Sequence, residues 1–139
     1  MKTAAIPVGF GSIIAEGLTS SASEAWKAVA EGVLVTILAC HPLTEAKGKE
    51  AIIATIDYAP GAASPPHRHP GSAISYVLEG IIENQFGSEM PLTYERGQVW
   101  SEVPLVVHHF ARNASATRSA RTVVFLITDV GNSILLPPA

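Results

Sequence analysis

Short runs of β-branched and other apolar residues, separated by turn residues, dominate the chain from residue 33 onwards. Seven such runs have the length and the composition of β-strands. They cover residues 33–39, 51–58, 74–80, 81–86, 97–103, 106–113 and 122–130. Turn signals separate them, as at Pro60-Gly61 and Pro70-Gly71. A succession of short strands with no helices between them predicts an antiparallel all-β sandwich or barrel.

A different period precedes the first strand. Residues 20–32 begin with serines of the kind that cap a helix, and apolar residues then recur at helical spacing. Gly32 follows as a signal for the end of the helix. This pattern predicts one short helix. We therefore expect an N-terminal arm with a short helix over residues 1–32 and a barrel over residues 33–139.

The first fifteen residues are mostly apolar, but Pro7, Gly9 and Gly11 interrupt them. They faintly resemble a secretory signal, which stays open as an alternative to the cytoplasmic location that we expect. No uncharged apolar stretch reaches the ~18 residues of a membrane-spanning helix, so no membrane association is expected. An apolar arm of this kind can instead cross to a second subunit of a homodimer.

The composition narrows the class of protein. Hydrophobic residues make up 47% of the 139 residues and charged residues 15%, which excludes a long disordered chain and favours a large buried surface. Nine Lys and Arg residues and a net charge of −3 argue against a nucleic-acid partner. The single cysteine, Cys40, excludes an intrachain disulfide and is expected to be a buried thiol.

Four of the five histidines form two tight pairs, which makes them candidates for metal ligands. His67 and His69 are separated by one residue, so on an extended strand both imidazoles point to the same face. His108 and His109 point to opposite faces of a later strand, and one of them can supply a third imidazole. Three imidazoles with open positions suit a catalytic Fe, Ni, Zn, Mn or Cu site. The alternative is a set of hydrogen-bonded structural histidines.

The residues around the first pair resemble a known family. Gly61, His67, His69 and Gly80 follow the spacing of the first motif of the cupins, and the metal-binding Glu of that motif falls on Ala73. The short stretch between the two motifs is similar to that of small single-domain cupins.

The resemblance continues into the second motif. Residues 97–104 and 108–113 are similar to it, with Leu105 where the motif usually has Gly and His108 as the third metal histidine. On spacing alone, a bulge in the strand would make His109 the ligand instead. The resemblance, which covers about residues 50–130, implies a jelly-roll β-barrel, commonly a homodimer, with a divalent metal in its mouth.

The alanine at position 73 departs from the family pattern and leaves three interpretations. A neutral three-histidine site could keep an open coordination position and attract an anionic substrate. A carboxylate from elsewhere, Glu79, Glu83 or Glu102, could replace the missing ligand, and Glu102 is the best candidate and the candidate catalytic residue. The metal site could also have decayed.

We therefore expect a metal-dependent enzyme that acts on an oxygenated small organic molecule by stabilising an enolate or phenolate. A redox-active metal would favour a dioxygenase, whereas Zn or Ni would favour an isomerase, cyclase, dehydratase or decarboxylase (lyase). The alternative from another class is a non-catalytic cupin barrel that binds a ligand.

Overall fold

The computed structural model describes residues 26–139, and this part of the chain forms nine β-strands. They are β1 (Trp26–Ala30), β2 (Val33–Pro42), β3 (Lys49–Tyr58), β4 (Ser72–Glu79), β5 (Ile81–Phe86), β6 (Leu92–Glu95), β7 (Val99–Glu102), β8 (His108–Asn113) and β9 (Ala120–Asp129). None of the described residues lies in a helix, and so none belongs to a helix that could span a membrane.

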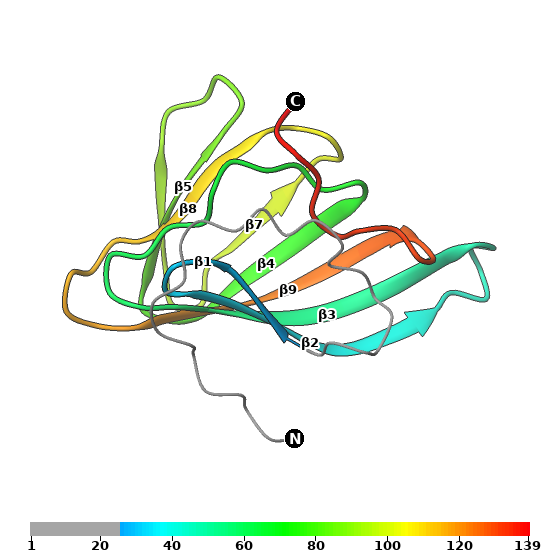
Figure 1. Cartoon of the computed structure of the whole chain (residues 1–139), viewed down its shortest axis with the longest axis horizontal. Helices are drawn as coiled ribbons and strands as arrows, with labels where there is room; N and C mark the ends of the chain where they lie inside the picture. Colours follow the sequence, from blue (N-terminus) through cyan, green and yellow to red (C-terminus); the bar gives the residue numbers. More distant parts are fainter. Residues whose placement is uncertain (1–25) are drawn as a thin grey trace.

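The strands form two antiparallel sheets, which confirms the all-β jelly roll predicted from the sequence. The larger sheet has six strands in the order β1-β2-β3-β9-β4-β7, and the smaller has three in the order β6-β5-β8 (Figure 1). Strands that are distant in sequence pair closely: β3 and β9 pair over their full length, and β5 pairs with β8 from Ile82 to Phe86. The core lies between the sheets: it combines Ile52, Val77 and Leu126 of the larger with Ile82 and Ala111 of the smaller.

The segment that carries the first histidine pair extends the smaller sheet. The backbones of His67 and His108 exchange two hydrogen bonds, of 3.0 and 2.8 Å, at the start of β8. On the opposite edge, Arg68 and Leu136 exchange two more, of 3.0 and 2.8 Å. The histidine segment therefore lies between β8 and the C-terminal tail.

The helix expected over residues 20–32 is wrong where the structure describes it, because Trp26–Ala30 is strand β1. Gly32, which the pattern indicates as a helix stop, instead has φ +74° and completes a two-residue turn in which Ala30 pairs with Val33. Pairing with β2 thus overrides the local helical preference. Residues 20–25 and the arm over residues 1–15 lie outside the described residues.

One other expectation needs correction, and one strand was not predicted. Cys40 is exposed rather than buried, because it lies in the outer half of β2, beyond a bulge between Ile37 and Ala39. Strand β6 has no counterpart among the predicted strands. Its four residues, Leu92–Glu95, are mostly exposed and too few to give an alternating pattern.

Two glycines with the same backbone conformation offer a test of packing at the end of β4. Gly80 has φ +79° and Gly48 has φ +80°, so alanine at either position costs about 1–2 kcal/mol. A Cβ atom at position 80 would lie 2.7 Å from the Ala120 Cβ, whereas one at position 48 would meet nothing within 4 Å. We expect Gly80→Ala to lose about 1–3 kcal/mol more stability than Gly48→Ala in denaturant unfolding. Equal losses would contradict this packing.

Candidate metal centre

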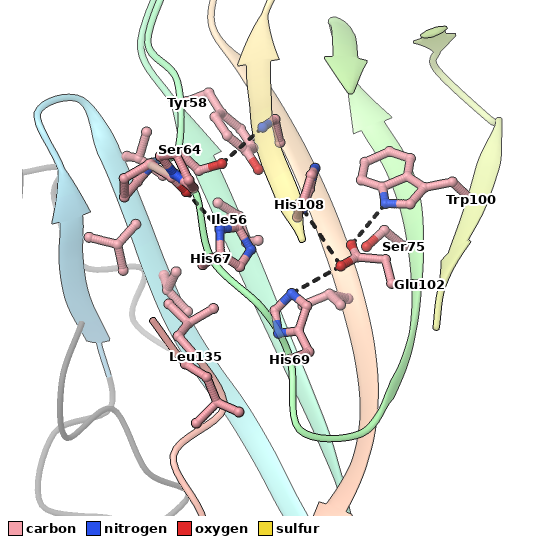
Figure 2. Close-up of a pocket in the computed structure, with 18 residues that line it drawn as sticks. Ile56, Tyr58, Ser64, His67, His69, Ser75, Trp100, Glu102, His108 and Leu135 are labelled. Carbon is pink, nitrogen blue, oxygen red and sulfur yellow. Dashed lines mark hydrogen bonds and ion pairs between the residues drawn. The ribbon is translucent and has the colours of Figure 1, made fainter. Parts of the chain in front are cut away.

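Three histidines and one carboxylate converge inside the barrel. The potential ligand atoms of His67, His69, Glu102 and His108 all lie within 4.8 Å of one another (Figure 2). The first two precede β4, Glu102 ends β7 and His108 begins β8. The structure therefore brings together all four of the site residues singled out from the sequence.

Backbone carbonyls fix the orientation of the first two imidazoles. The Nδ1 atom of His67 lies 2.8 Å from the carbonyl oxygen of Pro65, and Nδ1 of His69 lies 2.7 Å from that of Ile134. Because a carbonyl oxygen only accepts, both Nδ1 atoms carry the hydrogen. The Nε2 atom of each ring is thereby left for the cluster, an arrangement that metal-binding histidines commonly share.

The third imidazole presents its other nitrogen. His108 Nε2 donates to Oδ1 of Asn84 at 2.8 Å, and its ring stacks on Phe86 with centroids 4.1 Å apart. Nδ1 of His108 is buried and has no hydrogen-bond partner among the described residues. The donor atoms available at the cluster are thus two Nε2 atoms and one Nδ1 atom.

A bulge does occur in β8, but the expectation that it would bring in His109 is wrong, because it is His108 that enters the cluster. Gln85 pairs with Phe110 but Phe86 pairs with His108, so His109 is the extra residue in β8. Regular alternation from the buried Ala111 would have turned His109 inward. Instead His109 Nε2 lies 2.9 Å from the carbonyl oxygen of Gly87, outside the cluster.

Glu102 is held from two sides. Its Oε2 lies 3.1 Å from Nε2 of His69 and 3.6 Å from Nδ1 of His108, and its Oε1 accepts a hydrogen bond of 3.0 Å from the indole N–H of Trp100. In the pairing of β4 with β7, Glu102 lies directly opposite Ala73. The cluster therefore contains a carboxylate, as the second of the three interpretations of Ala73 requires, and it is not the neutral three-histidine site of the first.

The other two candidate carboxylates lie elsewhere. Glu83 pairs with Arg112 on the outside of the smaller sheet, and Glu79 is exposed at the end of β4.

The electrostatics of the cluster follow from its burial. Burial acts to raise the pKa of Glu102, but the hydrogen bond and the charge of His69 lower it to about 2. Burial acts to lower the pKa of His69, but Glu102 outweighs it and raises this pKa. For His67 and His108 burial prevails and lowers the pKa to about 4 and about 3. The cluster thus favours an ionised Glu102 and neutral imidazoles at His67 and His108.

A largely apolar pocket, partly open to solvent, adjoins the cluster. Besides the four cluster residues, the described residues that line it are Val29, Val33, Val35, Ile56, Tyr58, Ser64, Pro65, Pro66, Ser75, Trp100, Ala111, Val124, Leu135 and Leu136. None of these is Lys or Arg. Burial raises the pKa of Tyr58, so its hydroxyl stays neutral. Apolar walls with a few convergent polar groups are typical of a site for a small organic molecule.

Leu105 supports the sequence alignment of the second motif. It has φ +66° and is the only non-glycine residue with positive φ in the described part of the chain. Its position is the one at which the motif usually has Gly, which adopts this conformation without strain. The Leu105 N–H donates to the carbonyl oxygen of His69 at 2.9 Å, so the strained residue connects the two motifs.

Sequence reasoning missed Asn84 and the C-terminal tail and gave Trp100 no role at the site. Asn84 was detectable, because it alternates with Ile82 and Phe86 and therefore lies on the apolar face of its strand. No sequence pattern indicates that the carbonyl group of Ile134 returns to His69.

Comparison with known families agrees with this architecture. The family model described as Cupin domain matches residues 54–126, more than half of the chain. The chain belongs to the cupin family. Both histidine pairs and Glu102 lie within the match, so the whole cluster belongs to the cupin domain.

Named relatives are plant proteins. The cupin is 33% identical to putative germin-like protein 3-2 of Oryza sativa subsp. japonica over 100 residues, which are 69% of this chain and 45% of that protein. It is 38% identical to germin-like protein 1-1 of the same plant over 65 residues, 44% of this chain and 30% of that protein. The chain thus spans less than half the length of these relatives.

Solved structures share the fold. An oxalate oxidase superposes with a TM-score of 0.57 and 24% identity, over 76% of this cupin and 54% of that chain. KdgF from Halomonas sp. superposes with a TM-score of 0.58 and 21% identity, over 86% of this cupin and 94% of that chain. At these identities the likeness establishes the fold alone.

The hydrogen bond between Asn84 and His108 generates a prediction. Asn84→Leu removes the acceptor that orients the ring, and it should weaken the binding of Zn²⁺, used as a probe, by about 10–100-fold. Asn84→Asp keeps an acceptor oxygen and should stay closer to the original affinity. Competition with a chelator measures both, and Gln85→Leu, on the other face of β5, serves as the control. An unchanged affinity in Asn84→Leu would contradict the role of Asn84.

Proposed function

We propose that this cupin is a metal-dependent enzyme that acts on a small, mainly apolar organic molecule with an oxygen donor. The observation that carries the proposal is the convergence of three imidazoles, each with its far nitrogen hydrogen-bonded, beside an apolar pocket. Structural histidines need no such convergence. Oriented rings with lone pairs directed at one point are typical of metal ligands.

The residues fit a divalent transition metal. His108 Nδ1 is a buried acceptor without a hydrogen-bond partner in the described part of the chain. Buried polar atoms nearly always have a partner, and a bound metal ion would supply one here. Imidazole donors suit Fe, Ni, Zn, Mn or Cu, and His67, His69 and His108 would hold the ion. A metal bound there would supply a Lewis acid toward a substrate oxygen, the chemistry that stabilises a developing enolate or phenolate.

The residues of the pocket would bind and orient the substrate. Apolar side chains such as Val35, Ile56 and Leu135 line it and would exclude water from the reacting oxygen. Tyr58, which keeps its proton, is a hydrogen-bond donor for a substrate oxygen. Because no Lys or Arg is among the described lining residues, a dianion such as oxalate would find no cationic side chain. We therefore favour an enolisable diketone or a phenol over oxalate, the substrate named for a structural neighbour.

Metal content gives the direct test. We expect the purified protein, or the protein reconstituted with Fe(II), Ni, Zn, Mn or Cu, to hold about one ion per chain in elemental analysis. His67→Ala should lose it because a ligand is removed, whereas His41→Ala, an exposed histidine far from the cluster in sequence, should keep it. If the protein binds none of these ions, the proposal of a metal-dependent enzyme is wrong, and the non-catalytic ligand-binding barrel is the remaining interpretation.

Turnover separates the two branches of chemistry. A 1,3-diketone and a phenol are incubated with the metal-loaded protein while dioxygen and product are followed together. Dioxygen consumption with Fe(II) would identify a dioxygenase, and product without oxygen consumption would identify an isomerase, cyclase, dehydratase or decarboxylase. The His67→Ala protein, treated with the same metal ion, is the negative control, and product formation by it would contradict catalysis at this cluster.

We further infer that the protein is a homodimer joined through the outer face of the larger sheet. Exposed apolar side chains cross four adjacent strands there, since Ile53 pairs with Phe125, Phe125 with Ile74, and Tyr76 with Val99. A continuous apolar strip without charged residues is unusual on a monomer, and two such sheet faces can pack together as in a β-sandwich.

The dimer proposal predicts the effect of one charge. Ile74 is 51% exposed and lies at the centre of the strip. The Ile74→Lys substitution should convert the dimer to a monomer, because the lysine would be buried in the interface without a partner for its charge. Met90→Lys, at an 80% exposed position between β5 and β6, should leave it a dimer. Light scattering after size exclusion gives the mass of each. A dimeric Ile74→Lys protein would contradict this interface.

A further inference from the structure

Two neighbouring strands offer one inward position each beside the candidate metal centre. Ala73 of β4 and Glu102 of β7 are direct cross-strand partners, and both are buried, with 1% and 8% of their surface exposed. Directly opposed residues of an antiparallel pair have Cβ atoms about 4.5–5.5 Å apart and project to the same side of the sheet. A carboxylate on either strand can therefore reach the same region of the barrel.

We infer that Glu102 is the fourth metal ligand and that it replaces, from the facing strand, the carboxylate that the first family motif carries at position 73. This inference rests on the proposed metal-dependent function and deepens it. The carboxylate has not been lost from the site, as Ala73 alone would indicate. It has moved across one strand pair.

The placement of the two Glu102 oxygens supports a role as ligand. Oε1 is occupied by the indole N–H of Trp100 at 3.0 Å. Oε2 lies between the donor atoms of two candidate ligands, 3.1 Å from His69 Nε2 and 3.6 Å from His108 Nδ1. One oxygen is thus held by the protein and the other is directed at the point where the imidazole nitrogens meet, as in a carboxylate that binds through a single oxygen.

Moving the carboxylate from position 73 to position 102 also explains the residue type at both positions. Glu102 is an acidic residue with no Lys or Arg among the described residues of its pocket, so the cluster and the Trp100 indole N–H compensate its charge. Two carboxylates on the paired positions would repel each other at short range in a buried site. An alanine opposite the glutamate avoids this repulsion and leaves volume for the longer side chain.

The test moves the carboxylate back. Affinity for Zn²⁺ is measured by chelator competition, and the visible spectrum of bound Co²⁺ reports the ligands around the ion. Glu102→Gln keeps the size of the side chain and an acceptor for Trp100 but removes the charge, so it should weaken Zn²⁺ binding at least 10-fold and change the Co²⁺ spectrum. Glu102→Ala should weaken it as much or more. Glu83→Gln, a carboxylate outside the cluster, should change neither readout.

The transposed protein carries Ala73→Glu together with Glu102→Ala, which nearly conserves volume. It should bind Zn²⁺ at least 10-fold more tightly than Glu102→Ala alone, with thermal unfolding of the metal-free proteins as the check on folding. A folded double variant without this recovery would overturn the transposition.

The outcomes distinguish this inference from the function on which it rests. If the original protein binds no metal, the proposed function fails. If it binds metal and Glu102→Gln binds equally well with an unchanged Co²⁺ spectrum, Glu102 is no ligand, and the inference fails while the three-histidine enzyme stands.

Discussion

An ionised carboxylate inside an apolar pocket is the constraint around which this cupin is organised. Glu102 is 8% exposed, and burial without compensation would cost several kcal/mol. Compensation comes from His69 on one oxygen and Trp100 on the other. His69 can serve because Ile134 accepts the hydrogen of its other nitrogen. Each polar group of the site is thus positioned by a further group, as expected of a polar cluster held in a low-dielectric interior.

The backbone makes this cluster possible, because its members come from segments that are distant in the chain. The segment with His67 and Arg68 is hydrogen-bonded to β8 on one edge and to the C-terminal tail on the other. Leu105 adds a bond to His69 from a left-handed conformation that costs about 1–2 kcal/mol. The barrel thus tolerates a strained backbone at Leu105, because contacts elsewhere in the fold offset its free-energy cost.

The sequence predicts the barrel and the cluster members better than their arrangement. Alternating apolar runs locate seven strands, and the spacing of His67 and His69 places both on one face. Alternation cannot decide between His108 and His109, because the bulge in β8 depends on pairing with β5. It likewise cannot pair position 73 with Glu102, since cross-strand register depends on tertiary contacts. The prediction of a helix over residues 20–32 is wrong for the same reason: residues 26–30 form a strand because they pair with β2.

The presence of Glu102 changes how the proposed enzyme would select a substrate. Three neutral imidazoles around a divalent ion would leave a charge of about +2 to attract an anion, but the carboxylate reduces it to about +1. The described pocket adds no Lys or Arg to that remaining charge. Burial of apolar surface, worth about 25 cal/mol per Å², then becomes the main source of affinity. Selectivity should accordingly follow the shape of the walls formed by β2, β3 and the C-terminal tail more than the charge of the ligand.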